Sequence, residues 1–320
     1  MLHKAKIFIV ALSLLLLCQL WCTNSQVNVG GIRPEDITIV NSNSNSNNNV
    51  AATTTTTSIL IKNGIVVNAD QSFKADVLIE NDKIVRVSKT PIVIQQSDDH
   101  HHQNHHHHFP GVKVLDANGM YVMPGGIDTH VHMEMPFMGT VSKDDFETGT
   151  RAALAGGTTM IMDFPIMSAD KGPLAIYEEY RQKAGERATC DYGFHIGITR
   201  FDSKVKREME QLSRELGTIN SYKFFMAYKG ALMLNDEPLY EAMKVARSVG
   251  AISMIHAENG DMVHSKQREL VEQGITGPEG HALSRPSWVE AEAVHRVSVL
   301  AHQANAPVYI VHVTSKEAME

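Results

Sequence analysis

Residues 158–198 read TTMIMDFPIMSADKGPLAIYEEYRQKAGERATCDYGFHIGI, and this stretch decides the fold class. The apolar runs Thr158–Phe164 and Asp191–Ile198 predict two strands, and the helical run Pro173–Ala188 predicts a helix between them. A helix that joins two strands is typical of a parallel pair, because antiparallel neighbours need only a short turn. The stretch therefore predicts an α/β protein built on a parallel sheet.

The same alternation of strand and helix continues on both sides of this stretch. Six βα units are expected, with strands at 122–132, 158–164, 191–198, 221–227, 251–256 and 307–313, and helices at 144–155, 173–188, 205–216, 237–249, 260–273 and 287–305. Because no Gly-rich dinucleotide fingerprint opens a unit, a Rossmann fold is the weaker hypothesis. A (β/α)8 barrel needs eight units over about 250 residues. Residues 121–320 are therefore predicted to form an incomplete TIM-type barrel of about six units.

The first 120 residues divide into three expected parts. Within residues 1–25, the positively charged Lys4 and Lys6 precede the short apolar run Ile7–Leu17. This pattern predicts a cleaved signal peptide and a route into the secretory pathway. An uncleaved membrane anchor is the alternative, although the run is shorter than the roughly 20 residues of a spanning helix. The protein would be cytoplasmic if the signal is not used. Residues 26–58 are polar, of low complexity and expected to be disordered. Residues 59–120 alternate apolar residues with Asn-Gly and Asn-Asp pairs, which predicts a small β-sandwich module with a His-rich insertion at 95–108.

Charge, cysteine and histidine content exclude several classes of protein. The 320 residues carry 29 Lys and Arg against 36 Asp and Glu, a formal net charge of −7, and no long basic run, so nucleic acid is not an expected partner. Two of the three cysteines, Cys18 and Cys22, lie in the predicted signal peptide, which excludes a disulfide scaffold. The insertion holds seven of the 17 histidines, but a solvated loop gives them no fixed metal-binding geometry.

Polar residues lie where the expected strands end. His130 and His132 close the first strand and, being two apart, point to one face, so both imidazoles can reach one metal ion. Lys223 is a lone cation in the apolar fourth strand, and His256 and His312 end the fifth and sixth strands. Catalytic residues of a barrel converge at the carboxyl ends of its strands. Four histidines and a lysine in register therefore predict a metal site rather than packing.

The lysine is the unusual member of this set. A buried ammonium without a partner tends to lose its proton, and a neutral amine can add carbon dioxide to form a carbamate. A carbamate is a bidentate anion that can bridge two divalent ions. By itself Lys223 would be interpreted as a snorkelling cation or a salt-bridge partner, but beside four histidines we favour the carbamate.

Four longer motifs resemble a known family. They are Gly125–Gly139 (GGIDTHVHMEMPFMG), Ser221–Gly230 (SYKFFMAYKG), His256–Gly260 (HAENG) and Gly277–Pro286 (GPEGHALSRP). These motifs are similar to those of dihydropyrimidinases and their hydantoinase relatives, which are cyclic amidohydrolases of the amidohydrolase superfamily. The resemblance runs from residue 59 to the end of the chain, apart from the His-rich insertion.

The resemblance implies an activity and a metal centre. The activity is hydrolysis of the cyclic amide of 5,6-dihydrouracil or dihydrothymine to the N-carbamoyl-β-amino acid, a step of pyrimidine degradation, with a hydroxide bridging two Zn²⁺ ions as nucleophile. His130 and His132 would bind the first ion, His256 and His312 the second, and carboxylated Lys223 (N6-carboxylysine) would bridge both.

The resemblance also implies roles outside the ligand set. Tyr228 would stabilise the oxyanion. Asp128 precedes the His pair, and from that position we expect it to orient one of the ligands without touching a metal ion. In this family a further Asp, at the end of the eighth strand, binds metal and takes the proton from the bridging water. No residue up to Glu320 matches it, so we expect an incomplete sequence record and no activity from the 320 residues alone. A homotetramer is implied for the full-length protein.

Two other classes of function stay open. Allantoinase and hydantoinase share the expected metal centre, and the sequence does not identify the ring substrate. Dihydroorotase is less favoured, because Glu134 stands where its family uses an Arg to bind the substrate carboxylate. A non-catalytic scaffold like the collapsin response mediator proteins shares the fold, but those proteins have lost most of the metal ligands. The final compartment of the secretory pathway also stays open.

Overall fold

The computed structural model describes residues 7–10, 58–94 and 112–320. They divide into two compact units. The first draws on Met1–Asp128, Thr148–Ile161 and Thr189–Asp191, and the second on Thr129–Glu147, Met162–Ala188 and Tyr192–Glu320. The predictions for most of the signal peptide, for the low-complexity segment up to residue 57 and for the His-rich insertion lie outside the described residues; Ser58, the last residue of the predicted disordered segment, begins the first long strand.

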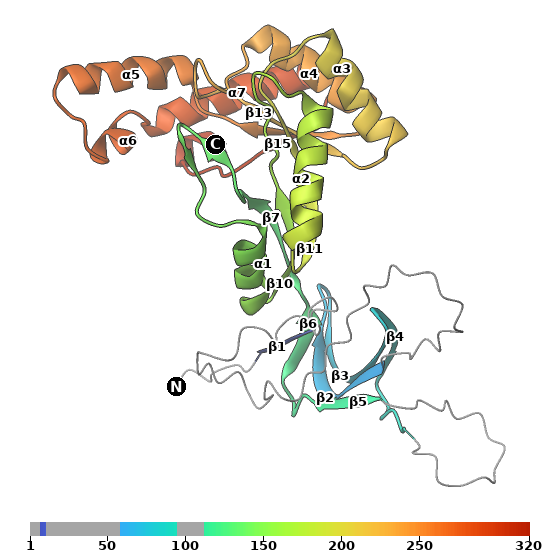
Figure 1. The fold of residues 1–320 in the computed structure, drawn as a ribbon. Coiled ribbons are helices and arrows are strands. Elements are labelled where there is room, and N and C mark those ends of the chain that lie inside the picture. The colour runs from blue at the N-terminus through green and yellow to red at the C-terminus, as the bar shows by residue number, and fades with distance from the viewer. Residues whose placement is uncertain (1–6, 11–57, 95–111) are drawn as a thin grey trace, which may run out of the picture. The chain divides into compact units, whose positions relative to one another are not determined.

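The first unit holds a six-stranded sheet of order β1-β6-β2-β3-β4, in which β5 also pairs with β2 (Figure 1). Its strands are β1 (Ile7–Val10), β2 (Ser58–Val67), β3 (Ser72–Glu80), β4 (Lys83–Ser88), β5 (Lys113–Asp116) and β6 (Tyr121–Pro124). β2, β3 and β4 pair antiparallel, whereas β1, β5 and β6 join by parallel pairing. β1 lies within the predicted signal peptide.

The Asn-Gly pair at 63–64 and the Asn-Asp pair at 81–82 lie in different structures. Asn81, with φ 57°, lies in the turn between β3 and β4, so the predicted hairpin forms there. Asn63 has the same φ, but it lies inside β2, where the pairing with β3 shifts register between Ile61 and Gly64. The Asn-Gly pair thus marks a β-bulge rather than a turn.

β2 and β3 bury side chains on both of their faces. One face contributes to a cluster that includes Ile59, Ile61, Val77, Ile79 and Val122. The alternate residues form a second cluster, Leu60, Leu78 and Ile92. Each such side chain contributes about 1.5–3 kcal/mol when fully buried, so apolar alternation on these two strands stabilises the sheet from both sides.

Strand and helix alternate through the rest of the chain. A three-stranded sheet has the order β11-β10-β7, and a four-stranded sheet has the order β12-β13-β14-β15 with parallel pairing throughout. Their strands are β7 (Gly126–Val131), β10 (Thr158–Asp163), β11 (Asp191–Phe194), β12 (Ile196–Ile198), β13 (Ser221–Phe225), β14 (Ile252–His256) and β15 (Val308–Ile310). The α/β class with a parallel sheet is therefore confirmed.

Two expected strands are divided in the structure. The strand predicted at 122–132 separates at Gly125 into β6 and β7, which belong to different sheets. A Cβ on Gly125 would lie 2.0 Å from Thr159 Cγ2, so only glycine allows this close approach. The strand predicted at 191–198 separates at His195 into β11 and β12. Backbone hydrogen bonds from His195 N–H to Asp163 O and from Gly197 N–H to Pro165 O keep this segment aligned with residues 163–165 across the break.

Three helices, α2, α4 and α7, pack on the four-stranded sheet of the second unit (Figure 1). α2 packs on β12, α4 on β13 and β14, and α7 on β15. The helices are α1 (Phe146–Ala155), α2 (Pro173–Arg187), α3 (Ser203–Glu210) with a π-helical turn η3 (Gln211–Glu215), α4 (Asp236–Ser248), α5 (Gly260–Glu272), α6 (Glu279–Leu283), α7 (Ser287–Ala304) and α8 (Lys316–Met319). The helix predicted at 205–216 thus changes to π geometry in its second half. In the part of the chain that the structure describes, no helix combines the length and apolar content that a bilayer crossing needs.

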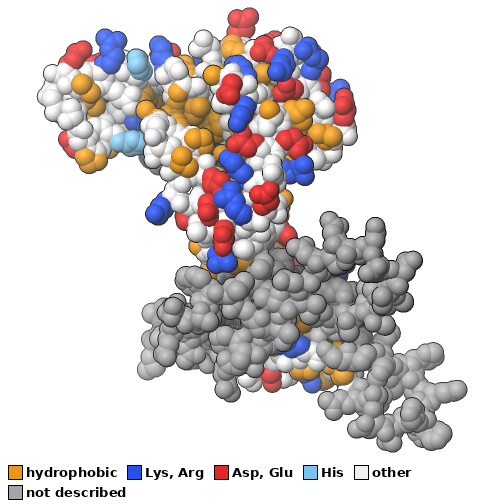
Figure 2. All heavy atoms as spheres, viewed as in Figure 1, with side chains coloured by type: hydrophobic (Ala, Val, Ile, Leu, Met, Phe, Trp, Pro, Cys, Tyr) orange, Lys and Arg blue, Asp and Glu red, His pale blue; other side chains and the backbone are white. Residues whose placement is uncertain are grey.

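Side-chain caps fix where two of these helices begin. The carboxylate of Asp202 accepts the N–H groups of Lys204 and Val205 at 2.8 and 2.9 Å, and Asn259 Oδ1 accepts Met262 N–H at 3.0 Å. Over the face shown in Figure 2, acidic and basic side chains are interspersed on the helices. Exposed ion pairs also occur within single helices, such as that of Arg181 with Glu178, 2.9 Å apart on α2.

Candidate metal centre

Strand register brings three of the predicted ligands to one edge of the four-stranded sheet. Phe225 of β13 aligns with His256, the last residue of β14, and Lys223 lies two residues before Phe225 on the same strand. Ile255 aligns with Ile310 of β15, so His312 follows just beyond the end of that strand. The arrangement is the one expected from strand ends in a parallel sheet.

The four predicted histidines form a continuous series of ring contacts. The ring centroids of His130 and His132 are 5.3 Å apart, those of His130 and His312 are 5.4 Å apart, and those of His312 and His256 are 4.7 Å apart. His312 therefore contacts both His130, predicted to bind the first ion, and His256, predicted to bind the second ion together with His312.

Lys223 contacts an aromatic ring beside each histidine pair. Its side chain is buried, and its Nζ lies 5.3 Å from the ring centroid of Phe164 and 5.4 Å from that of Phe225. The Phe164 ring is 4.4 Å from His130, and the Phe225 ring is 6.1 Å from His256. The structure thus brings together all five predicted ligands.

Burial favours the uncharged forms of Lys223 and of three of the four histidines. It lowers the pKa of Lys223 to about 7. Burial, reinforced by the charge of Lys223, lowers the pKa of His130 to about 3 and that of His132 to about 4. Burial, followed by the charges of His256 and Lys223, lowers the pKa of His312 to about 4. Metal binding requires neutral imidazoles, and these three are neutral at physiological pH.

His312 and the neighbouring residue Tyr228 adopt left-handed backbone conformations. Tyr228 has φ 64° and His312 has φ 42°, values that are uncommon for residues with bulky side chains. Such a conformation costs about 1–3 kcal/mol and persists only where the surroundings enforce it. The Tyr228 carbonyl accepts the N–H groups of Ala231 and Leu232 at 2.9 and 3.0 Å, which holds the turn after β13.

Tyr228 lies against the ligand predicted for the second ion. Its ring centroid is 5.1 Å from that of His256 and 5.3 Å from that of Phe137, which belongs to the short hairpin of β8 (Pro136–Phe137) and β9 (Thr140–Val141). Burial and the neighbouring charge of Glu258 raise the pKa of the Tyr228 hydroxyl. The hydroxyl therefore keeps its proton and can donate a hydrogen bond.

The model of the amidohydrolase family matches residues 121–295, which are more than half of the chain. The chain belongs to the amidohydrolase family. Metal dependence is general in this family. The matched region contains four of the five predicted ligands, and His312 lies beyond it.

Three of the proteins that match this amidohydrolase chain are dihydropyrimidinases or a hydantoinase. A dihydropyrimidinase of Dictyostelium discoideum is 49% identical over 258 residues, which cover 81% of this chain and 48% of that protein. Among solved structures, dihydropyrimidinase from Brevibacillus agri gives a TM-score of 0.74 at 39% identity, covering 82% of this chain and 53% of that one. A D-hydantoinase from Bacillus sp. AR9 gives 0.72 at 38%, covering 81% and 52%. The chain spans about half the length of the relatives it matches.

The residues of this amidohydrolase cluster fit a divalent ion that takes nitrogen ligands. Besides the neutral imidazoles, His132 Nδ1 is buried and has no hydrogen-bond partner among the described residues. The described residues do not include three His, Cys, Asp or Glu side chains already arranged to hold an ion. The imidazoles lie ring against ring, and an ion about 2 Å from each nitrogen would require them to turn toward it.

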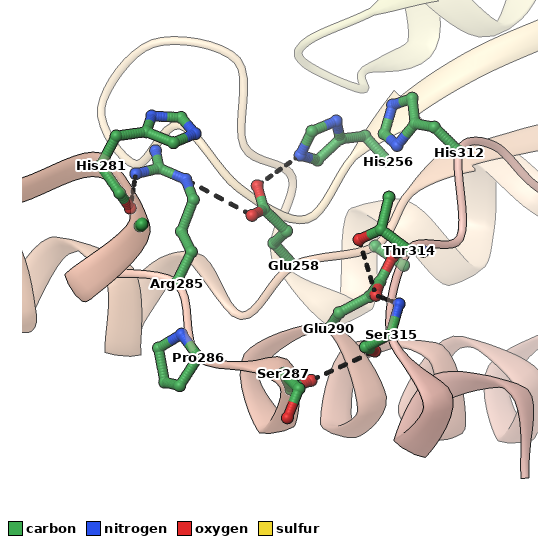
Figure 3. A pocket seen from close by; sticks show the side chains of 12 residues that line it. His256, Glu258, His281, Arg285, Pro286, Ser287, Glu290, His312, Thr314 and Ser315 are labelled. Atoms are coloured by element: carbon green, nitrogen blue, oxygen red, sulfur yellow. Dashed lines mark hydrogen bonds and ion pairs between the residues drawn. The ribbon is translucent and has the colours of Figure 1, made fainter. Parts of the chain in front are cut away.

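A cavity of about 320 Å³ opens beside the pair predicted for the second ion. Figure 3 shows His256 and His312 at one side of it, with Glu258 pointing to His256 and Arg285 reaching Glu258 from the segment after α6. The carboxylate of Glu290, on α7, accepts the N–H groups of Thr314 and Ser315 at 2.9 and 2.7 Å. It therefore holds the segment that follows His312.

Two buried polar residues near the cluster were not predicted from the sequence. His195 Nδ1 lies 2.5 Å from Ser221 Oγ, and its ring centroid is 4.9 Å from that of Phe164. Asp163 Oδ1 accepts the N–H groups of Phe164 and Met133 at 2.8 and 3.2 Å, and burial raises the pKa of this carboxyl to about 7. The sequence did offer one signal for His195, which is a histidine inside the apolar run 191–198.

Two further positions discussed from the sequence are Asp128 and Glu134. Asp128 lies exposed in β7, and its role in orienting a ligand stays a prediction. Glu134 forms an ion pair with Arg187 and accepts Phe146 N–H at 3.4 Å, so a cation already compensates its charge.

Proposed function

We propose that the protein containing this chain hydrolyses the ring amide of 5,6-dihydrouracil and dihydrothymine to N-carbamoyl-β-amino acids. The observation that carries the proposal is the assembly of His130, His132, Lys223, His256 and His312 from the ends of four strands. The substrate class is supported by the dihydropyrimidinases among the relatives.

The proposed metal centre contains two Zn²⁺ ions. His130 and His132 would hold one, His256 and His312 the other, and Lys223 would contact both as a carbamate. Zinc would supply Lewis acidity toward the ring carbonyl and a lowered pKa for bound water. Burial supports the carbamate, because a lysine whose pKa is about 7 is partly neutral amine at physiological pH.

The proposed role of Tyr228 is to donate its hydroxyl hydrogen to the oxygen that becomes negative as the ring amide is attacked. The raised pKa of this hydroxyl keeps the proton available. The ring contact with His256 supports a position beside the second metal site. One donor of this kind accounts for about 10²–10³ in kcat.

Hydrolysis of dihydrouracil by the full-length purified protein tests the proposal. We expect two zinc ions per chain, loss of dihydrouracil absorbance on incubation, abolition by a chelator and recovery with Zn²⁺. Faster hydrolysis of hydantoin would favour the second candidate, a hydantoinase, which the match to D-hydantoinase supports. A zinc-loaded protein that opens none of these rings would overturn the proposal, and absence of zinc would favour a non-catalytic scaffold.

The architecture, assembly and location of the whole protein are also proposals. We infer a (β/α)8 barrel to which this chain supplies about six units, with the six-stranded sheet as part of a β-sandwich; the parallel order β12-β13-β14-β15 supports it. A homotetramer would give four times the chain mass by light scattering. If the signal peptide is cleaved, N-terminal sequencing of protein recovered from the secretory pathway should begin after about residue 25.

A further inference from the structure

His256 has a carboxylate partner that none of the predicted roles uses. Its Nε2 lies 2.6 Å from Glu258 Oε2, and both side chains are largely buried, with 11% and 19% of their surfaces exposed. Glu258 follows His256 by two residues and directly precedes Asn259, the cap of α5. The end of β14 and the start of α5 therefore fix the separation of the ring and the carboxylate.

A second layer of contacts orients Glu258 itself. Its Oε1 lies 3.4 Å from Nε of Arg285, which is also largely buried. Nη1 of Arg285 donates to Ser284 Oγ at 2.9 Å, so the guanidinium is held from the side away from Glu258. Figure 3 shows the resulting line of side chains, from Arg285 through Glu258 to His256, beside the cavity.

This arrangement selects one nitrogen of His256. An ionised carboxylate only accepts hydrogen bonds, so Nε2 must carry the hydrogen that binds Glu258. In a neutral imidazole the other nitrogen, Nδ1, then has a free lone pair. Metal-binding histidines are generally held in this way by a carboxylate on the opposite nitrogen.

We propose that Glu258 is a positioning residue for the second metal ion. It fixes His256 in the tautomer that offers Nδ1 to the ion, and Arg285 holds the Glu258 carboxylate in place. The inference rests on the metal centre of the proposed function, and it adds the two residues that hold His256 in the orientation the ion needs.

Metal titration of full-length variants tests the proposal. Glu258→Leu removes the acceptor, and we expect the affinity for the second Zn²⁺ to fall by about 10–100-fold, the usual effect of such a partner. The first ion, held by His130 and His132, should bind with unchanged affinity. Competition against a chromophoric chelator measures both constants without relying on catalysis.

A conservative variant separates positioning from simple support of the fold. Glu258→Gln keeps an oxygen that can accept from Nε2 but loses the charge, so we expect a loss of affinity between those of wild type and Glu258→Leu. Arg285→Met should give a smaller loss than Glu258→Leu. The visible spectrum of Co²⁺ in the second site should change in Glu258→Leu and stay close to wild type in Glu258→Gln.

Glu178→Leu is the matched control, because it breaks an exposed Glu–Arg pair of similar separation on α2. It should leave both affinities and the Co²⁺ spectrum unchanged. Unchanged affinity for the second ion in Glu258→Leu would overturn the inference while leaving the proposed function intact. Two bound ions without dihydrouracil hydrolysis would overturn the substrate assignment alone. A wild-type protein that binds no second ion would overturn both. Should Glu258→Leu not fold, the decision passes to the other two variants: wild-type affinity for the second ion in both Glu258→Gln and Arg285→Met would refute the inference.

Discussion

Replacing Lys223 with methionine should stabilise the metal-free protein, although it removes a proposed ligand. Lys223 is 1% exposed, and burial lowers its pKa from 10.5 to about 7. The unfolded chain therefore holds a proton on this amine between pH 7 and 10.5, whereas the folded chain has released it. Methionine has a similar length and no charge, so Lys223→Met removes this penalty.

The magnitude follows from the shift in pKa. A difference of 10.5 − 7 = 3.5 units corresponds to about 5 kcal/mol where both states are protonated, since one unit is about 1.4 kcal/mol. At pH 7 the folded lysine is half neutral, and the penalty is about 4 kcal/mol. Because the unfolded state binds more protons, wild-type stability should rise by about 1.4 kcal/mol per pH unit between pH 7 and 10.5. The destabilisation is fully present below pH 7 and is lost toward pH 10.5.

Denaturant unfolding of metal-stripped protein in carbonate-free buffer measures this effect. Lys223→Met should have a free energy of unfolding up to about 4 kcal/mol above wild type at pH 7, and the difference should shrink to about 1 kcal/mol at pH 9.5. Groups that do not interact with Lys223 cancel in the comparison, and His130, His132 and His312, with pKa values of about 3 to 4, stay neutral over this pH range. Lys206→Met, at an exposed position of α3, is the control and should keep the wild-type pH slope. A variant no more stable than wild type, with an unchanged pH slope, would refute the buried neutral amine.

Four further substitutions probe the site and its support. Lys223→Ala in the full-length protein should abolish both hydrolysis and the bridged metal pair; retention of both metals would contradict the carbamate. Tyr228→Phe should lower kcat by about 10²–10³ with unchanged zinc content, and an unchanged kcat would exclude its hydroxyl from the reaction. Asp202→Ala removes the cap of α3 and should lower the free energy of unfolding by about 1 kcal/mol in denaturant titration. Gly260→Ala would place a Cβ 2.7 Å from Met233 Sδ and 2.8 Å from a backbone oxygen, so it should destabilise by about 1–3 kcal/mol by the same assay; wild-type stability would show that the start of α5 can shift.

The order of strands and helices could be predicted from the sequence because burial leaves a local signal. β13 is buried along its whole length, and its continuous apolar run identified it. The divisions at Gly125 and His195 could not be predicted, because they depend on Thr159 and on the bridge between Ile166 and Gly197, which join segments about 30 residues apart in sequence. The π-helical end of α3 likewise left no pattern distinct from an ordinary helix.

The cluster of proposed ligands was predictable for the same reason, since His130, His256 and His312 end apolar runs and strand ends meet in a parallel sheet. The residues that hold those ligands were not predictable. Glu258 has the sequence context of an ordinary loop acid, and its hydrogen bond to His256 depends on how the chain turns from β14 into α5. Arg285 meets Glu258 only because the segment after α6 returns to the cavity.

The left-handed backbone at Tyr228 and His312 has an evolutionary consequence. Glycine or asparagine would adopt these conformations with less strain, so under the proposed function selection for the side-chain chemistry would maintain a phenol and an imidazole there. In a lineage that no longer needs the reaction, these two positions should drift toward glycine or asparagine early, while the apolar strands beneath them persist. Glycine at both positions in an otherwise intact relative would therefore record the loss of catalysis with the fold retained.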